Sequence, residues 1–126
     1  MKISNRKTLI RTAMGLDQFD LIIENVNIVE VYTGKIEPGS LGIKDGRIVT
    51  LNAKGGDTIE TYDGNGFFAL PGFIDTHVHI DSTLLTPENL SELIVPCGTT
   101  VMLADPMEIA NVAGLPGVKV LLESMH

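Results

Sequence analysis

The sequence of 126 residues is poor in cysteine and in aromatic side chains: it contains one cysteine, Cys97, no tryptophan and 5% aromatic residues. One thiol can form neither an internal disulfide nor a cysteine-based zinc site, and we expect Cys97 to be a small buried core residue. The shortage of aromatic rings disfavours a stacking platform for single-stranded nucleic acid. No apolar run reaches the roughly 18 residues of a membrane helix, so we expect no membrane span and no signal peptide.

Basic residues are also scarce, with nine Lys and Arg against sixteen Asp and Glu and a net charge of −7. An acidic surface repels phosphate groups, so the charge disfavours nucleic acids and anionic membranes as partners. Hydrophobic residues make up 44% of the chain, which is ordinary globular composition and disfavours a disordered protein. We expect a cytoplasmic, folded protein.

The first half of the chain changes from a helical to a strand pattern near residue 20. Residues 1–19 contain apolar residues on one stripe of a short helix, and Gly15 suits its end. Residues 20–70 hold short runs rich in β-branched residues, and Asp45-Gly46 between two such runs is a strong hairpin signal. We therefore predict an amino-terminal helix followed by a small antiparallel β unit.

The second half follows a β-α-β-α pattern. Residues 73–81 and 99–104 are predicted to be buried strands, and Thr86 with Pro87 is a good helix start between them. The stripe expected to be buried on that helix is Leu90, Leu93 and Ile94. A further helical stretch begins near Glu108. This order predicts a parallel sheet, and the fold class is α/β.

Two βα units cannot close a parallel sheet with both faces covered. A (β/α)₈ barrel takes about 250 residues and eight strands. We therefore expect these residues to be the front end of a longer enzyme whose barrel is incomplete in this chain.

The run Asp75-Thr76-His77-Val78-His79 carries the strongest chemical signal. Side chains alternate along a strand, so Asp75, His77 and His79 are predicted to share one face. Two imidazoles at the carboxyl end of a barrel strand can bind one divalent ion, and Asp75 is a candidate for orienting a ligand from behind. The alternative is a pair of histidines without a ligand role; the Pro-Gly turn, the apolar strand and the upstream carboxylate favour metal binding.

Two acidic residues follow the predicted strand 99–104, and each of them allows two interpretations. Asp105 is either a turn carboxylate before Pro106 or a residue close to the site. Glu108 is either an acid favoured by the helix dipole or a residue behind the metal ligands or near the substrate. His126 has no partner at a suitable spacing and receives no role.

Residues 71–79 resemble the first-strand signature of the amidohydrolase superfamily. Residues 96–100 and 104–114 resemble segments of one group in it, the adenine deaminases. In that superfamily a small β-sandwich built from both chain ends flanks a (β/α)₈ barrel. The resemblance implies that residues 20–70 are the amino-terminal half of the sandwich and that residues 71–126 begin the metallo-hydrolase barrel.

The resemblance also implies an activity: metal-dependent hydrolysis of adenine, or a related purine base, to hypoxanthine and ammonia by the full-length enzyme, a homo-oligomer. It implies two divalent transition-metal ions, Mn²⁺ or Fe²⁺ with Zn²⁺ as a further choice, and His77 and His79 as metal ligands. The other ligands and the general acid would lie beyond residue 126, so the chain alone is expected to be inactive.

Two positions depart from the adenine deaminase pattern. Met107 stands where the group usually has His, and Asp81 stands where it usually has Glu. A thioether does not bind a hard cation, so no ligand is assigned to Met107. Two alternatives remain: another amidohydrolase acting on a cyclic amide or an N-acetyl substrate, and a non-catalytic structural or assembly module.

Overall fold

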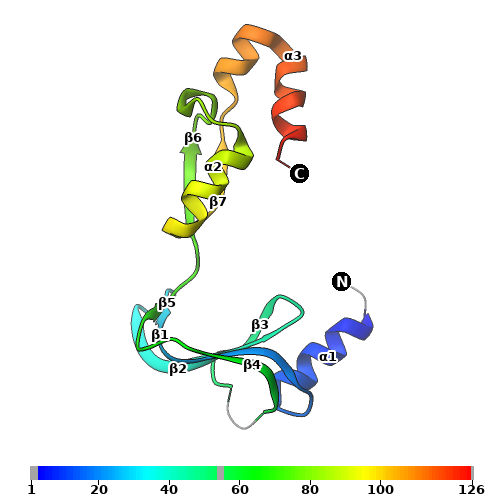
Figure 1. Cartoon of the computed structure of the whole chain (residues 1–126), viewed down its shortest axis with the longest axis vertical. Coiled ribbons are helices and arrows are strands. Elements are labelled where there is room, and N and C mark those ends of the chain that lie inside the picture. The colour runs from blue at the N-terminus through cyan, green and yellow to red at the C-terminus, as the bar shows by residue number, and fades with distance from the viewer. Residues whose placement is uncertain (1–2, 54–55, 126) are drawn as a thin grey trace. The chain divides into compact units, whose positions relative to one another are not determined.

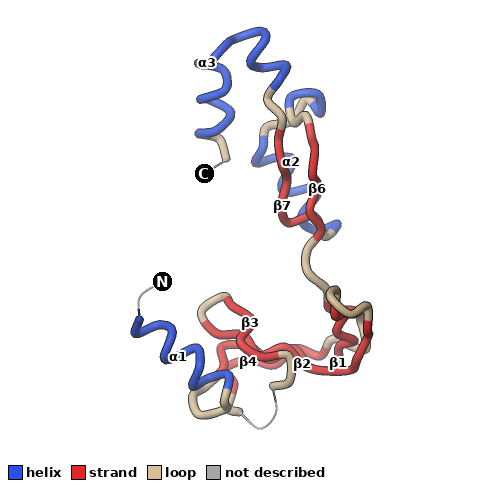
Figure 2. The backbone as a smooth tube through the Cα atoms, turned by 180° about the vertical axis from the view of Figure 1, so that it is seen from behind, coloured by secondary structure: helices blue, strands red, loops and turns tan. Residues whose placement is uncertain are grey.

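We describe a computed structural model of the chain, in which residues 3–53 and 56–125 are described (Figures 1 and 2). The chain divides into two compact units, Met1–Leu70 and Pro71–His126. Among the described helices, none has both the length and the apolar composition needed to cross a membrane.

The first unit is one helix and a mixed sheet. Helix α1 ends before Gly15, whose φ of +72° is a left-handed conformation that favours glycine. The elements are α1 (Ile3–Ala13), β1 (Phe19–Glu30), β2 (Lys35–Lys44), β3 (Arg47–Thr50), β4 (Thr58–Asp63) and β5 (Phe68–Ala69).

The sheet corrects the prediction of a purely antiparallel unit. Its order is β3-β2-β1-β4, with β5 also paired to β1. The β1–β2 and β2–β3 pairs are antiparallel as predicted. Strands β4 and β5 pair with β1 in parallel, because the chain after β3 crosses to the other side of β1 and re-enters in the same direction.

The predicted hairpin turn is confirmed at Asp45-Gly46. Their φ angles of +51° and +67° are those of the turn that Asp-Gly favours between two strands. Asp20 on β1 holds this turn in place: its carboxylate accepts hydrogen bonds from Lys44 Nζ at 2.6 Å and from the Asp45 backbone N–H at 2.7 Å.

The core of this unit centres on Phe19, Ile22 and Val26, which are all buried. The ring of Phe19 lies where a Cβ atom on Gly42 or on Gly56 would be, so both glycines make room for the ring. Thr12 of α1 is also fully buried.

The second unit confirms the predicted parallel pair. Strands β6 (Phe73–Val78) and β7 (Thr99–Ala104) are parallel neighbours (Figure 2). Strand β6 ends three residues earlier than predicted, because the chain turns at Ile80 into a 3₁₀ helix. The other elements are η1 (Asp81–Thr83), α2 (Pro87–Ile94), η2 (Val95–Cys97) and α3 (Met107–Glu123).

The helices of this unit begin and break where the sequence indicates. Thr86 caps α2, because its side chain accepts a hydrogen bond from the Asn89 backbone N–H at 3.3 Å. Helix α3 is interrupted at Gly114, whose φ of +59° and ψ of −154° are not helical, and Pro116 follows two residues later.

The burial predicted for this unit is wrong at several positions. Ile80 and Leu90 are buried, but Leu93 is 60% exposed, and Cys97 is exposed rather than part of a core. The apolar side chains of both strands are also largely exposed: Phe73, Ile74, Val101 and Leu103. A two-stranded ribbon presents more apolar surface than the described helices of this unit cover.

Candidate metal centre

The carboxyl ends of β6 and β7 bring the two histidines next to an aspartate. His77 lies on β6, His79 follows its last residue, and Asp105 follows the last residue of β7. The Asp105 backbone N–H donates a hydrogen bond to the Val78 carbonyl at 2.9 Å, which ties the two strand ends together. We call the three residues His77, His79 and Asp105 the histidine–aspartate cluster.

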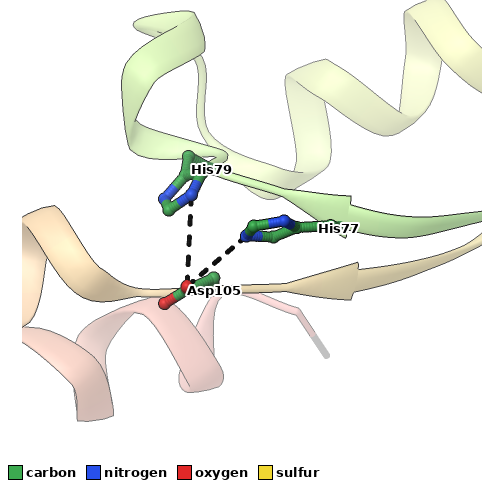
Figure 3. Close-up of side chains that lie close together, drawn as sticks. All are labelled: His77, His79 and Asp105. Carbon is green, nitrogen blue, oxygen red and sulfur yellow. Dashed lines mark ion pairs between the residues drawn. The ribbon is translucent and has the colours of Figure 1, made fainter.

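The imidazoles of this cluster both turn a nitrogen toward the same carboxylate oxygen (Figure 3). The ring centroids of His77 and His79 are 4.9 Å apart. From Asp105 Oδ2, the distance to Nε2 is 3.5 Å for His77 and 4.0 Å for His79. Both distances exceed a normal hydrogen bond, so the three atoms converge without being directly bonded to one another.

This spacing fits a divalent cation. Ligand bonds of 2.0–2.2 Å in a tetrahedral site place the donor atoms about 3.4 Å from one another. The three donor atoms of the cluster all lie within 4.8 Å of one another. Two imidazoles and a carboxylate also suit Zn, Mn and Fe. The side chain of His77 is 65% exposed and that of Asp105 is 45% exposed, so the cluster is open to solvent in this chain.

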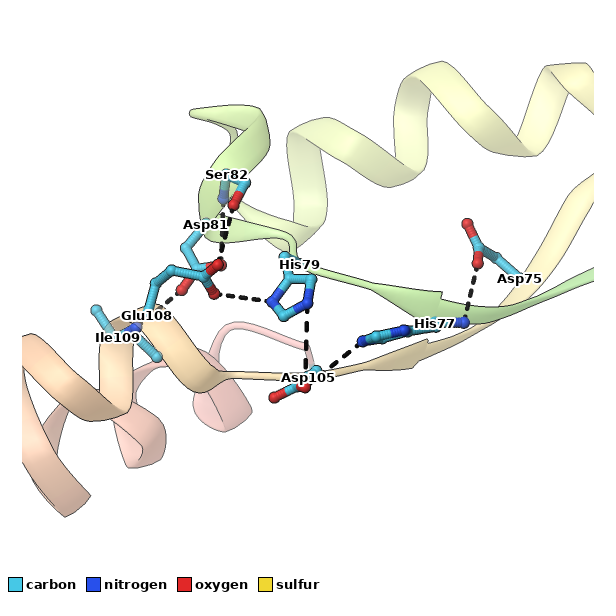
Figure 4. Close-up of polar contacts among 8 residues, drawn as sticks. All are labelled: Asp75, His77, His79, Asp81, Ser82, Asp105, Glu108 and Ile109. Atoms are coloured by element: carbon cyan, nitrogen blue, oxygen red, sulfur yellow. Dashed lines mark hydrogen bonds and ion pairs between the residues drawn. The ribbon is translucent and has the colours of Figure 1, made fainter.

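His79 has a second partner on its other ring nitrogen. Its Nδ1 lies 2.8 Å from Oε2 of Glu108, in the first turn of α3 (Figure 4). The hydrogen bond to Glu108 raises the pKa of His79 above its ordinary value, while partial loss of hydration opposes this. The sequence did not decide between the two interpretations of Glu108. In the structure, Glu108 contacts the ring nitrogen of His79 that faces away from Asp105.

Asp81 has a structural task that the sequence did not indicate. Its Oδ2 accepts a hydrogen bond from the Ile109 backbone N–H at 2.8 Å, and its Oδ1 accepts one from the Ser82 N–H at 3.1 Å. Pro106 at the start of α3 provides no side-chain cap, so Asp81 satisfies a free N–H of that helix from a distant segment. No local spacing could have revealed a contact across 28 residues.

Asp81 also belongs to a second group of possible metal donors, His79, Asp81 and Glu108, whose atoms lie within 4.8 Å of one another. These carboxylates are already engaged in hydrogen bonds to α3, Ser82 and His79. The histidine–aspartate cluster is therefore the better metal site of the two.

Asp75 and Met107 lie outside the cluster. The Asp75 carboxylate accepts a hydrogen bond from the His77 backbone N–H at 3.1 Å, and Figure 4 shows it turned away from Asp105. The β6–β7 register shifts between Asp75 and Val78, which interrupts the simple alternation expected for this strand. Met107 is 51% exposed, and His126 lies outside the described residues.

The comparisons with known proteins cover both units. Residues 68–126 match the amidohydrolase family. The chain is 54% identical over 116 residues to adenine deaminase of Desulforamulus reducens, covering 91% of this chain and 20% of that protein. It is 42% identical over 116 residues to adenine deaminase of Thermosipho africanus, covering 92% of this chain and 20% of that protein. The chain thus spans about a fifth of the length of these relatives.

Two solved structures share the fold. An N-acyl-D-glutamate deacylase from Bordetella bronchiseptica, complexed with zinc and a phosphonate inhibitor, has a TM-score of 0.57 and 25% identity, covering 68% of this chain and 18% of that one. A prolidase complexed with N-methylphosphonate-L-proline has a TM-score of 0.51 and 22% identity, covering 75% of this chain and 29% of that one.

Proposed function

We propose that the chain belongs to the amidohydrolase family, whose pattern residues 68–126 match, and that it provides the first metal ligands of an enzyme that hydrolyses adenine to hypoxanthine and ammonia. The observation that carries this proposal is the convergence of His77, His79 and Asp105 at the ends of two parallel strands. The identity to two adenine deaminases supports the choice of a purine base as substrate.

The residues of this chain have distinct tasks in that reaction. His77 and His79 would hold the ion through Nε2, and the carboxylate of Asp105 would supply a third donor with negative charge. When bound, a divalent ion lowers the pKa of water to about 7, which is the chemistry that hydrolysis at neutral pH requires. A general acid must protonate the amino group so that it leaves as ammonia, and we place this acid beyond residue 126.

The finer features of the proposal follow the family resemblance. The full enzyme would contain two divalent ions, Mn²⁺ or Fe²⁺, with Zn²⁺ also compatible with the donors of the histidine–aspartate cluster. Residues 20–70 would form the amino-terminal half of a β-sandwich domain, and residues 71–126 would begin the barrel. We also propose that the full enzyme is a cytoplasmic homo-oligomer.

The proposal is tested in the full-length enzyme with His77→Ala and His79→Ala. Each variant is expected to lose one metal equivalent and most of its adenine turnover, because the reaction depends on that ion. Glu88→Gln, an exposed acid in the first turn of α2, is the matched control and should keep its metal and turnover. Asp75→Asn alters a carboxylate that contacts the His77 backbone and should have a smaller effect than either histidine variant. Metal analysis and ammonia release are measured on the same samples.

The outcomes separate the alternatives. Full metal content and normal turnover in both histidine variants would reduce the pair to a packed strand motif. Metal-dependent hydrolysis of an N-acyl amino acid with no activity on adenine would favour a deacylase, the chemistry named for the similar Bordetella structure. No hydrolysis of either substrate by the metal-loaded enzyme would favour a non-catalytic module.

A further inference from the structure

Both carboxylate oxygens of Glu108 are engaged. Oε2 lies 2.8 Å from Nδ1 of His79, and Oε1 accepts a hydrogen bond from Ser82 Oγ at 3.3 Å. An ionised carboxylate only accepts hydrogen bonds, so Nδ1 must carry a proton. The lone pair of the neutral ring is then on Nε2, the nitrogen that faces Asp105 at 4.0 Å.

The 3₁₀ helix η1 holds the start of α3, the segment that carries Glu108, through two hydrogen bonds. Asp81 in η1 accepts a hydrogen bond from the backbone N–H of Ile109, the residue after Glu108, at 2.8 Å. Ser82, the neighbour of Asp81, then reaches Glu108 itself. The 3₁₀ helix η1 and the first turn of α3 are therefore joined at two points, one on the backbone and one on the carboxylate (Figure 4).

The two histidines differ in this respect. His79 has a carboxylate on Nδ1 and is the less exposed of the two, at 27% against 65% for His77. Among the described residues, the ring of His77 makes one ion pair, with Asp105, one ring contact, with His79, and no other hydrogen bond or ion pair. A change at Glu108 should therefore act on one imidazole and spare the other.

We infer that Glu108 is a positioning residue: it fixes His79 in the Nδ1–H tautomer and directs Nε2 of His79 toward Asp105, the other side of the proposed metal site. The inference rests on the proposed function for the role of His79 as a metal ligand. A partner behind a ligating histidine typically changes metal affinity by about 10–100-fold. Because both its oxygens are already engaged, Glu108 acts behind the ligand and is not itself a donor to the ion.

The test begins with the metal-free chain and needs no variant. Nitrogen-15 NMR of neutral histidine distinguishes a protonated from an unprotonated ring nitrogen. We expect His79 to be the Nδ1–H form in the wild-type chain. Glu108→Gln should lose this preference, because a neutral amide is a weaker acceptor than a carboxylate. Glu88→Gln, an exposed acid in the first turn of α2, is the matched control and should leave His79 unchanged.

Zn²⁺ titration of the same samples gives the second readout. Glu108→Gln should bind Zn²⁺ about 10–100-fold more weakly than wild type, and Glu88→Gln should match wild type. An Nε2–H form of His79 in the wild-type chain, or equal Zn²⁺ affinity in wild type and Glu108→Gln, overturns the inference. A wild-type chain that shows the Nδ1–H form but binds no Zn²⁺ counts instead against the proposed metal-binding function.

Discussion

At the scale of single residues, a few polar side chains fix segments that are distant in sequence. Asp20 on β1 binds both Lys44 and the backbone of Asp45, and so holds the β2–β3 turn. The hydrogen bond from Lys44 has the largest effect on the pKa of Asp20, and the one from the Asp45 backbone adds to it. Both lower this pKa below its ordinary value. The carboxylate of Asp81 likewise fixes the start of α3 through a hydrogen bond, and that of Glu108 fixes the ring of His79.

The lowered pKa of Asp20 predicts a pH-dependent contribution to stability. A carboxyl group whose pKa is lower in the folded state stabilises the fold above its unfolded pKa and loses this effect as pH falls through the folded pKa. Asp20→Asn should therefore be less stable than wild type at pH 7, and the difference should shrink below about pH 4. The raised pKa of Lys44 contributes stability at neutral and acid pH and is lost only as pH rises into the alkaline range, so the titration of Lys44 does not produce a change in this acid window.

Urea unfolding of both proteins at neutral and acid pH measures this difference. Asp57→Asn, an exposed carboxylate whose side chain makes no hydrogen bond or ion pair among the described residues, serves as the control. A stability gap for Asp20→Asn that stays constant from pH 7 to the acid range would contradict the assignment.

At the scale of elements, sequence patterns were sufficient for turns, caps and the β6–β7 pair, but not for the pairing of β4 and β5 with β1. The Asp45-Gly46 turn and the Thr86 cap depend on residues within a few positions of each other, so the sequence predicts both. The parallel pairing of β4 with β1 joins Phe19 to Thr58 across the sheet, and no local pattern specifies it.

The candidate site divides in the same way. The spacing of His77 and His79 predicts their common role, whereas Asp105 reaches them only because β7 lies beside β6. The contact of Glu108 with His79 further requires the start of α3 to lie against η1. The burial predicted for β6, β7 and α2 was wrong. An apolar pattern shows which face of a strand or helix can be buried, but it does not show whether another element is present to cover that face.

The packing of Phe19 gives a prediction for the first sheet. A methyl group on Gly42 would overlap the ring of Phe19 and also meet the Thr50 side chain at 2.8 Å. Gly42→Ala should therefore destabilise the fold by about 1–3 kcal/mol, the usual cost of overfilling a core. Urea unfolding measures this cost.

A double variant provides the control for this prediction. Phe19→Leu removes the ring, so the Gly42→Ala cost should be smaller in that background than in wild type. Equal costs in the two backgrounds would show that the Phe19 ring is not what Gly42 accommodates.

At the scale of the whole molecule, the chain spans about a fifth of the adenine deaminases it matches, and its second unit leaves both strands of a parallel ribbon largely exposed. The proposed metal centre nevertheless has more donors than the His-x-His motif alone supplies. A catalytic metal site usually has three protein ligands, and Asp105 raises the number in this chain from two to three. This chain should therefore bind a divalent ion on its own, although we expect it to be inactive on adenine.

The most direct measurement is a Zn²⁺ titration of the chain as wild type, Asp105→Asn and His77→Ala, with Asp57→Asn as the control. Wild type and the control should each bind one equivalent in a saturable manner, and both cluster variants should bind at least about 10-fold more weakly because a ligand is removed. Absence of saturable binding by the wild-type chain, or binding that neither cluster variant weakens, would contradict the account.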